Sequence, residues 1–448
     1  MFSPLRKWEN VMFSPLRKWE PDEELAKKWQ ESLGTQRYRW VMLIIWLVMM
    51  TINSITLTNY PLALPEIAHE FSIPSNTYIY FYGVLSYSLG LFIIYFANFK
   101  GWMNIRIKLA VLLSQLFLIV PLFLIPITRN YLLIVLLRFI EGLWFMELAL
   151  ATLNLRGWFG RFELAIAMAA PLSALQFGSA LGGLLEKLVA EQIGWQSAFY
   201  ITGIMDLAVT ILFFIFYRDP KGYNDFLVIN KRRNLALRGT HGCPPPYKLP
   251  VAYTIGFAQI ATTMAFASIP YLVPTSGYAA GYSPTAVSMA VLIYGIISGL
   301  GIWGGALLGS AMVRRTRTIK ETFRARNLTR TISYIISLIG FLVLTLFSDN
   351  YALYVIGAVL AALVLFNIPN YWAEMTEVVP SGVSGEFVFF SGAVASAGFF
   401  LGPLISIYLI ISAAYRVGFI LFIAVLVLSG IINVIQNKVQ LPIDRYKA

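Results

Sequence analysis

The chain has 448 residues, of which 58% are hydrophobic and only 12% are charged. Soluble domains carry about a quarter charged residues, so this composition excludes an ordinary soluble protein and predicts one that crosses a membrane several times. The net charge of +12 would suit a nucleic-acid-binding protein, but basic loops beside lipid headgroups also explain it, and we expect no nucleic acid as a partner. The single cysteine, Cys243, excludes an intramolecular disulfide.

The first 39 residues are polar and contain the sequence MFSPLRKWE twice, beginning at Met1 and at Met12. They lack the apolar core of a signal peptide. Two interpretations stay open, a basic and aromatic segment on the membrane surface or an alternative start of the chain. We favour the second, because Pro4 and Pro15 would interrupt an interfacial helix.

Twelve apolar stretches follow, each near the roughly 20 residues that a helix needs to cross the hydrocarbon. We place them at 40–59, 78–97, 108–127, 131–153, 164–185, 197–217, 251–273, 286–309, 329–347, 351–371, 387–411 and 416–436. The sequence therefore predicts an all-α integral membrane protein with twelve transmembrane helices. A cytoplasmic tail is expected over 437–448.

The basic residues predict which side of the membrane the termini occupy. If the termini are cytoplasmic, the predicted cytoplasmic segments hold all but four of the 34 Lys and Arg residues, the exceptions being Arg129, Arg138, Lys187 and Arg416. This asymmetry is typical of membrane proteins, whose cytoplasmic loops are rich in Lys and Arg. We therefore expect cytoplasmic termini and a multi-pass protein of the cell membrane.

The spans divide into two equal sets. The longest interior hydrophilic stretch, expected as a cytoplasmic loop over 218–250, separates six spans in 40–217 from six in 251–436. FGSALGG in span 5 (Gly178, Gly182) and AGFFLGP in span 11 (Gly398, Gly402) occupy matching positions. Small residues at this spacing let helices approach closely. The pattern predicts two pseudo-symmetric six-helix bundles from a duplicated transporter.

Spans 4 to 6 carry four motifs by which the sequence resembles the major facilitator superfamily over about residues 40–436. These motifs are RFIEG (138–142), WFGRFELAIA (158–167), GWQSAFYITG (194–203) and YRDP (217–220). Within the superfamily they are most similar to the anion:cation symporter group. The resemblance implies transport by alternating access, and it implies that spans 1, 4, 7 and 10 line the pore.

Several positions depart from the superfamily pattern. Asn98 and Gly309 stand where the family has acidic residues in its two cytoplasmic motifs, and Gly160 replaces a proline. Where organic-anion members often have a glutamate, seven residues after the span-4 arginine, this chain has Phe145. The acids that would latch a cytoplasmic gate in the family are therefore missing here.

Span 4 holds three charges, Arg138, Glu141 and Glu147, each costly at bilayer depth. Arg138 and Glu141 are three residues apart and share a helix face, so they can pair. Two interpretations of Arg138 stay open, a self-satisfied ion pair with Glu141 or a guanidinium that binds an anionic group of the substrate. Gly142, which follows Glu141, is expected to pack closely or to serve gating.

Glu147 lies half a turn round the helix from Arg138 and has no basic residue within one turn. A buried carboxylate without a partner is expected to hold a proton part of the time, as a proton-coupling site requires. The alternative is a neutral glutamate hydrogen-bonded to a neighbouring helix. Glu141 and Asp206 of span 6 are further proton-coupling candidates.

The pore-lining spans offer polar residues for substrate binding, namely Asn53, Gln259, Thr263 and Asn367 besides Arg138. Gln259 and Thr263 are four residues apart and share a helix face. Each of these side chains could instead serve helix packing. We find no firmly intramembrane charge in the carboxyl half, so ionic recognition is expected mainly from the amino half.

These features predict a secondary transporter that moves a small organic anion, with protons as the coupling ion. The alternative is a proton-coupled exporter of amphipathic or cationic compounds. An enzyme is not expected, because the sequence has no nucleotide loop, metal cluster or nucleophile–base arrangement, and no cofactor or metal is implied. We expect a monomer.

Overall fold

The computed structural model describes residues 37–74, 81–98, 106–160, 162–220, 231–232, 235, 242–380, 382–411 and 414–445. These residues form helices and connecting segments, without a β-strand. The MFSPLRKWE repeat, Gly101, Arg161 and most of the predicted central loop lie outside the described residues.

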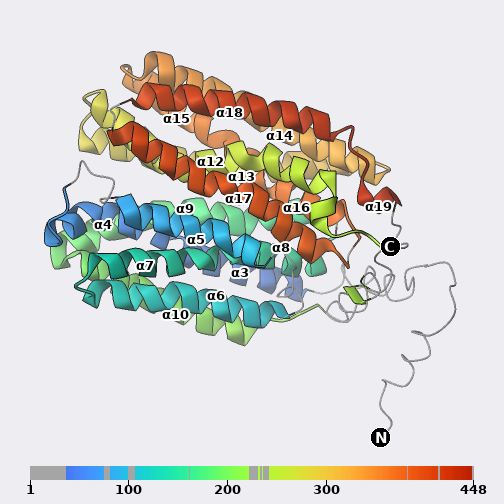
Figure 1. Cartoon of the computed structure of the whole chain (residues 1–448), viewed down its shortest axis with the longest axis horizontal. Coiled ribbons are helices and arrows are strands. Elements are labelled where there is room, and N and C mark those ends of the chain that lie inside the picture. The colour runs from blue at the N-terminus through green and yellow to red at the C-terminus, as the bar shows by residue number, and fades with distance from the viewer. Residues whose placement is uncertain are drawn as a thin grey trace, which may run out of the picture.

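The helices of the amino-terminal part lie together in the lower part of Figure 1, blue to green. They are α3 (Tyr38–Asn53), α4 (Thr56–Glu70), α5 (Tyr82–Ala97), α6 (Ile107–Leu124), η3 (Ile125–Ile127), α7 (Tyr131–Gly142), η4 (Leu143–Met146), α8 (Glu147–Trp158), α9 (Leu164–Ile193) and α10 (Trp195–Phe216).

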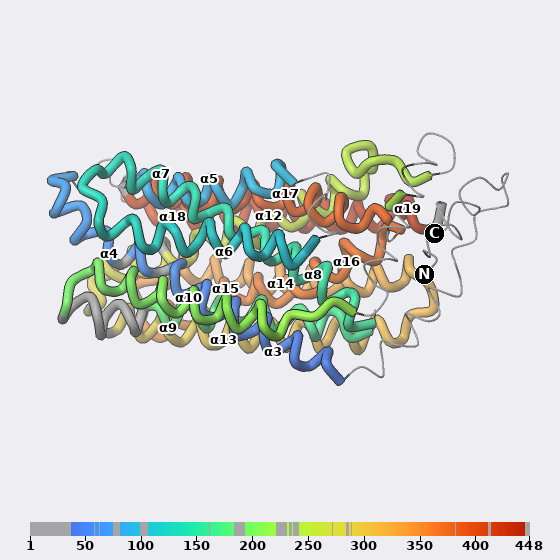
Figure 2. Tube along the Cα trace, turned by 90° about the horizontal axis from the view of Figure 1, so that it is seen from below, coloured from blue at the N-terminus to red at the C-terminus, as the bar shows by residue number. Residues whose placement is uncertain are grey.

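The helices of the carboxyl-terminal part lie above them, yellow to red (Figure 1). They are η5 (Pro246–Lys248), α12 (Pro250–Ala279), α13 (Pro284–Val313), α14 (Ile319–Phe347), α15 (Tyr351–Ala362), η6 (Leu363–Asn367), α16 (Ile368–Glu377), α17 (Ser384–Ile411), α18 (Tyr415–Gln436) and α19 (Pro442–Arg445). The start of α3 and the short α19 lie at the same end of the molecule, here called the α19 end (Figure 2).

The helices have the length and apolar character of membrane spans. Among the described residues, nine helices are long and apolar enough to cross a membrane, and the shorter helices Tyr38–Asn53 and Tyr82–Ala97 are apolar as well. Large apolar side chains such as Leu132, Ile204 and Leu346 are exposed on the outside of the molecule. A lipid environment makes this exposure favourable, so the structure describes a multi-pass membrane protein.

Two helices are interrupted at equivalent positions in the two parts. A 3₁₀ segment, η4, separates α7 from α8, and η6 separates α15 from α16. Both α7 and α15 are 12 residues long and begin after a capping asparagine, Asn130 or Asn350. The interval between these asparagines equals that between Gly178 and Gly398, which supports an internal repeat. A 3₁₀ segment within a helix often marks a hinge.

The predicted packing glycines lie where helices approach closely. A Cβ added at Gly178 would overlap the carbonyl of Thr51 on α3, and one added at Gly142 would overlap that of Tyr87 on α5. At Gly398 it would lie 2.7 Å from Ile260 O on α12. Gly402 is similarly close, with Met264 O at 2.6 Å, and Gly182 is buried in α9. The matching motifs therefore hold α9 against α3 and α17 against α12.

One expectation about the carboxyl half is wrong. Span 9 was placed at 329–347 and span 10 at 351–371, but α14 already begins at Ile319, and α16 continues to Glu377. A capping box starts α14, in which Thr318 accepts from the backbone of Glu321 and Glu321 accepts from the backbone of Thr318. Since a capping box satisfies otherwise unpaired backbone donors, it extends the helix beyond its apolar part.

We predict that Gly398→Ala lowers the free energy of unfolding by about 1–3 kcal/mol, because the new methyl group would press against the backbone of α12. Thermal unfolding of purified protein in detergent would measure the change. Gly160→Ala is the control, since an added Cβ there meets no described atom within 4 Å. Equal stability of the two variants would contradict the close packing of α17 on α12.

Candidate functional site

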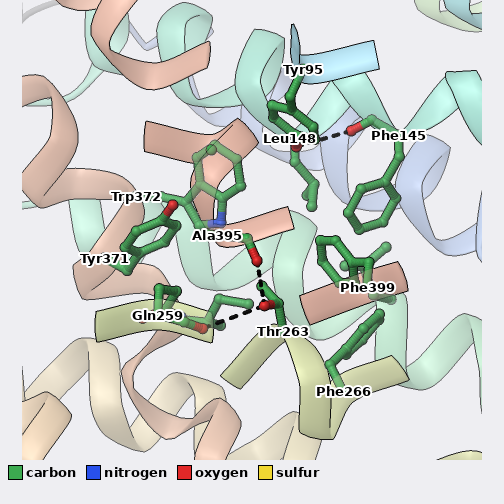
Figure 3. A pocket seen from close by; sticks show the side chains of 13 residues that line it. Tyr95, Phe145, Leu148, Gln259, Thr263, Phe266, Tyr371, Trp372, Ala395 and Phe399 are labelled. Atoms are coloured by element: carbon green, nitrogen blue, oxygen red, sulfur yellow. Dashed lines mark hydrogen bonds between the residues drawn. The ribbon is translucent and has the colours of Figure 1, made fainter. Parts of the chain in front are cut away.

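A small cavity lies between the two parts of the molecule. Its volume is about 20 Å³, room for about one water molecule. The lining side chains are mostly aromatic or aliphatic and come from both parts (Figure 3). They are Tyr95, Phe145, Leu148, Leu175, Gln259, Thr263, Phe266, Ile368, Tyr371, Trp372, Gly392, Ala395 and Phe399. An organic substrate would therefore need this cavity to widen.

Aromatic contacts between the two parts border the cavity on both sides. Toward the α19 end, Tyr95 of α5 packs against Trp372 of α16, with ring centroids 6.4 Å apart, and against Phe389 of α17 at 6.0 Å. On the other side, Phe145 of η4 meets Phe399 of α17 edge to face at 5.0 Å. Such pairs are favourable beyond the apolar area that they bury. The contacts on one side must separate for a molecule to enter or leave on that side.

Gln259 supplies an unused donor at the cavity. Its Oε1 accepts from Asn367 Nδ2 at 3.5 Å, whereas its buried Nε2 has no hydrogen-bond partner among the described residues. Thr263, one turn further along α12, donates to Ala395 O at 2.6 Å. A buried donor without a partner is costly, so an acceptor group of a bound molecule would be favoured beside Gln259.

Glu147 lies at the start of α8, fully buried within the amino-terminal part. Its Oε2 accepts from Asn53 Nδ2 at 2.8 Å, and its Oε1 accepts from Gln115 Nε2 at 2.7 Å. The Ser114 hydroxyl lies 2.6 Å from the same Oε1. These partners come from α3 and α6, so Glu147 links three helices. Phe145, two residues before Glu147, and Leu148, directly after it, line the cavity.

Arg138 and Glu141 form the ion pair that their spacing predicts, with Nη1 and Oε1 at 2.7 Å. The Arg138 guanidinium also lies over the rings of Tyr60 and Tyr87, with its central carbon 4.6 Å and 4.3 Å from their centroids. Aromatic faces attract a cation and offset part of its burial cost. Trp144 Nε1 donates to the hydroxyl of Tyr87 at 2.8 Å, which connects this cluster to η4.

Asp206 of α10 is the third buried acid of the amino-terminal part. Its two carboxyl oxygens have no hydrogen-bond partner in the described part of the chain. It interacts electrostatically with Glu147 and Glu141. The Thr210 hydroxyl, which bonds to the Asp206 carbonyl, also lies 2.8 Å from Gln115 Oε1. The three predicted proton-coupling acids therefore belong to one region.

The structure brings two of the five predicted substrate residues, Gln259 and Thr263, to the cavity. Asn53 instead holds Glu147, and Asn367 lies behind Gln259, where it also accepts from Thr329 at 3.0 Å. Arg138 is about 10 Å along the helix from Phe145 and is surrounded by Tyr60 and Tyr87. A direct role of these three residues in binding substrate stays a prediction.

The carboxyl-terminal part contains buried charges, contrary to expectation. Arg326 of α14 donates to both carboxyl oxygens of Glu377, at 2.8 Å and 2.7 Å, and to Asn370 Oδ1 at 3.0 Å. Arg330 pairs with Glu374 and donates to Asn433 Oδ1 at 2.9 Å. The spacing of these residues in the sequence could have indicated the two ion pairs, since Arg326 and Arg330 share one helix face and Glu374 and Glu377 share another.

Metal binding has no support within the described ranges, which contain no group of three or more His, Cys, Asp or Glu residues placed to hold an ion.

A family model described as Major Facilitator Superfamily matches residues 41–392, well over half of the chain. The chain belongs to this superfamily. Its structure is similar to the crystal structure of the human organic anion transporter MFSD10 (TETRAN), with a TM-score of 0.67, 13% sequence identity, and coverage of 89% of this chain and 100% of that chain. No curated protein matches the sequence. As a member of the major facilitator superfamily, the chain is a secondary transporter of small molecules and not an enzyme.

For the buried ionic cluster of this transporter, we predict that Glu374→Gln lowers the free energy of unfolding by about 3 kcal/mol or more, because it leaves the Arg330 charge buried and unpaired. Thermal unfolding in detergent would measure the loss. The control is Asp349→Asn, which breaks an ion pair with Arg416 whose side chains are 72% and 50% exposed. That change should cost no more than about 1 kcal/mol. Equal losses of unfolding free energy in the two variants would show that the buried ion pair contributes no more than the exposed one.

Proposed function

We propose that this transporter moves a small organic anion with an aromatic or apolar body, and that protons drive the transport. The support for an apolar body comes from the cavity, whose lining is mainly aromatic and aliphatic. The support for an anion comes from the unused donor on Gln259, which favours a hydrogen-bond acceptor such as a carboxylate. The lining residues include no acid that would repel this group.

One observation carries the proposal of proton coupling. Glu147 is a buried carboxyl, and Phe145, two residues before it, and Leu148, directly after it, line the cavity. A change in the protonation of Glu147 therefore acts on the same short segment that contacts the substrate. Intramembrane carboxyls are characteristic of proton relays in transporters. We assign Glu141 and Asp206 to the same proton-handling region.

The proposal also gives Arg138 a role, although its side chain does not line the cavity. In the structure its charge is offset by Glu141 and by the rings of Tyr60 and Tyr87. We propose that Arg138 attracts the anion when the side of the cavity away from the α19 end opens. Glu141 then takes up a proton when the anion competes for the guanidinium.

The proposal includes the arrangement of the protein in the membrane. We propose twelve spans in two six-helix bundles, 40–217 and 251–436, that rock about the cavity, with 218–250 as the loop between them. We propose that both termini lie in the cytoplasm, because the predicted basic loops lie at the α19 end. The start of α3 and α19 lie at this end (Figure 2). We propose that one chain is sufficient for transport.

A second candidate function is proton-coupled export of amphipathic or cationic compounds. The observation in its favour is that the lining residues of the cavity include no basic side chain, so an anion has no full positive charge beside it. The acids Glu141, Glu147 and Asp206 would then supply attraction for a cation. Transport measurements with compounds of either charge separate the two candidates.

The experiment is uptake into proteoliposomes with and without an imposed proton gradient. Benzoate, salicylate and indole-3-acetate serve as anions, and ethidium and tetraphenylphosphonium serve as cations. We expect the gradient to increase uptake of an aromatic anion by about tenfold, the effect of about 1.4 kcal/mol, and Glu147→Gln to abolish this increase. Glu163→Gln is the control, because Glu163 pairs with Arg39 away from the cavity.

Gradient-driven movement of ethidium or tetraphenylphosphonium, without movement of the anions, would favour the exporter. If Glu147→Gln still responds to the gradient as the parent protein does, the proposed role of Glu147 is wrong.

A further inference from the structure

The Ser114 hydroxyl has two acceptors but only one proton. Ser114 Oγ lies 2.6 Å from Glu147 Oε1 and 2.8 Å from the carbonyl oxygen of Trp144. A hydroxyl donates one hydrogen bond and accepts others, whereas a carbonyl only accepts. One proton shared between two acceptors gives weak three-centre bonds, so both short contacts are full two-centre hydrogen bonds only if Glu147 carries a proton and donates it to Ser114.

Protonation of Glu147 at Oε1 gives both oxygens of its carboxyl group, the Ser114 hydroxyl and the carbonyl of Trp144 a hydrogen-bond partner. Glu147 then donates to Ser114, and Ser114 donates to the carbonyl of Trp144. Gln115 Nε2 still donates to Oε1, and Asn53 Nδ2 still donates to Oε2. When Glu147 loses the proton, Ser114 turns its single donor to the carboxylate, since hydrogen bonds to charged groups are the stronger ones. The carbonyl of Trp144 then loses its bond to Ser114.

The carbonyl of Trp144 belongs to the break between α7 and α8. It lies in η4 and also accepts from the backbone N–H of Glu147. A serine that bonds to a helix carbonyl from the side competes with the regular helix pattern and bends the helix. The next residue, Phe145, packs on Phe399 of the carboxyl-terminal part and lines the cavity. The Ser114 bond therefore acts where the two parts of the transporter meet.

We propose that Ser114 is a positioning residue that transmits the protonation state of Glu147 to η4. With Glu147 protonated, Ser114 holds the carbonyl of Trp144 and keeps Phe145 against Phe399. With Glu147 ionised, Ser114 releases that carbonyl, η4 changes shape, and Phe145 separates from Phe399. This inference rests on the proposed proton-coupling role of Glu147 and adds the step that links the proton to the cavity.

Two basic residues on the helices that hold Glu147 have partners of their own. Arg39 of α3 pairs with Glu163, and Lys108 of α6 donates to the carbonyl of Phe214. Among the described side chains, the charged groups on the other elements that pack around this site are Arg138 and Glu141 of α7, Asp206 of α10, Arg156 of α8, Glu374 and Glu377 of α16 and Glu386 of α17. Of these, Glu141 and Asp206 are the acids whose titration could add to that of Glu147.

The carboxyl-terminal part offers a matched control. Ser337 of α14 donates to the carbonyl of Ala361 at 2.8 Å, just before η6. Asn367, an amide, occupies the position at η6 that Glu147 occupies after η4. Ser337 thus makes the same kind of bond beside the equivalent break, with no carboxyl partner recorded for it within the described residues. Its removal should leave any proton response intact.

The test measures cross-linking between cysteines at positions 145 and 399, without substrate. Phe145→Cys and Phe399→Cys are introduced in a Cys243→Ser background, since Cys243 is the single native cysteine. The yield with a short bis-methanethiosulfonate reagent is divided by that of a Phe266→Cys/Phe399→Cys pair. The rings of this second pair pack at 5.7 Å within the carboxyl-terminal part. This division removes the pH dependence of thiol chemistry itself.

We expect the normalised yield to be about three-fold higher at about pH 5.5 than at about pH 8.5, the size of change that one net hydrogen bond produces in an equilibrium. Ser114→Ala and Glu147→Gln should each abolish this difference. Ser114→Thr, which keeps the hydroxyl, and Ser337→Ala should both retain it. If Ser114→Ala is not monodisperse in detergent, Ser114→Val, which has the shape of Ser114→Thr but lacks the hydroxyl, takes its place.

Two results would overturn the proposal for Ser114. The first is an unchanged yield across this pH range in the parent protein. The second is a pH response that persists in Ser114→Ala but disappears in Glu147→Gln, which would leave the proton-coupling role of Glu147 intact. Gradient-driven uptake by Glu147→Gln, measured separately, would instead show that the proposed function itself is wrong.

Discussion

The burial of one carboxyl group, Glu147, beside a break in a membrane helix constrains the rest of the amino-terminal part. An uncompensated carboxyl is costly in lipid, so α3 and α6 must bring Asn53, Ser114 and Gln115 to it. The same break turns Phe145 toward the other half of the molecule. The need to give Glu147 hydrogen-bond partners thereby also fixes the position of Phe145, which lines the cavity.

Comparison of the two helix breaks, at η4 and at η6, separates the features that the fold requires from those that serve function. In the carboxyl-terminal part, Pro369 follows η6 and lacks a backbone N–H, which weakens the regular helix pattern there. Asn367 supplies a neutral side chain that bonds to Gln259 and Thr329. The fold can therefore make this break without an acid. A titratable group at the equivalent place in the amino-terminal part is an addition that the architecture does not need.

The all-helical membrane architecture could be predicted because it depends on apolar length and repeated glycines, both local properties of the sequence. The ion pair of Arg138 and Glu141 followed from helix spacing. The partners of Glu147 could not be predicted, because Ser114 and Gln115 are distant in sequence and only packing brings them together. The cavity residues Tyr95, Trp372 and Phe399 could not be predicted either, because 15% of the residues are aromatic and nothing in the sequence distinguishes these three. The pairs of Arg326 and Arg330 were missed because basic residues near a span end were counted as loop.

The most direct test of the account is whether transport itself moves protons. Proteoliposomes loaded with a pH-sensitive dye receive external indole-3-acetate without an imposed gradient, and protein-free liposomes correct for passive entry of the acid. The account predicts that the interior acidifies with about one proton for each molecule taken up, the occupancy of one carboxyl, and that Glu147→Gln takes up the anion without this acidification. Uptake of indole-3-acetate by the parent protein with no accompanying proton movement would contradict the account.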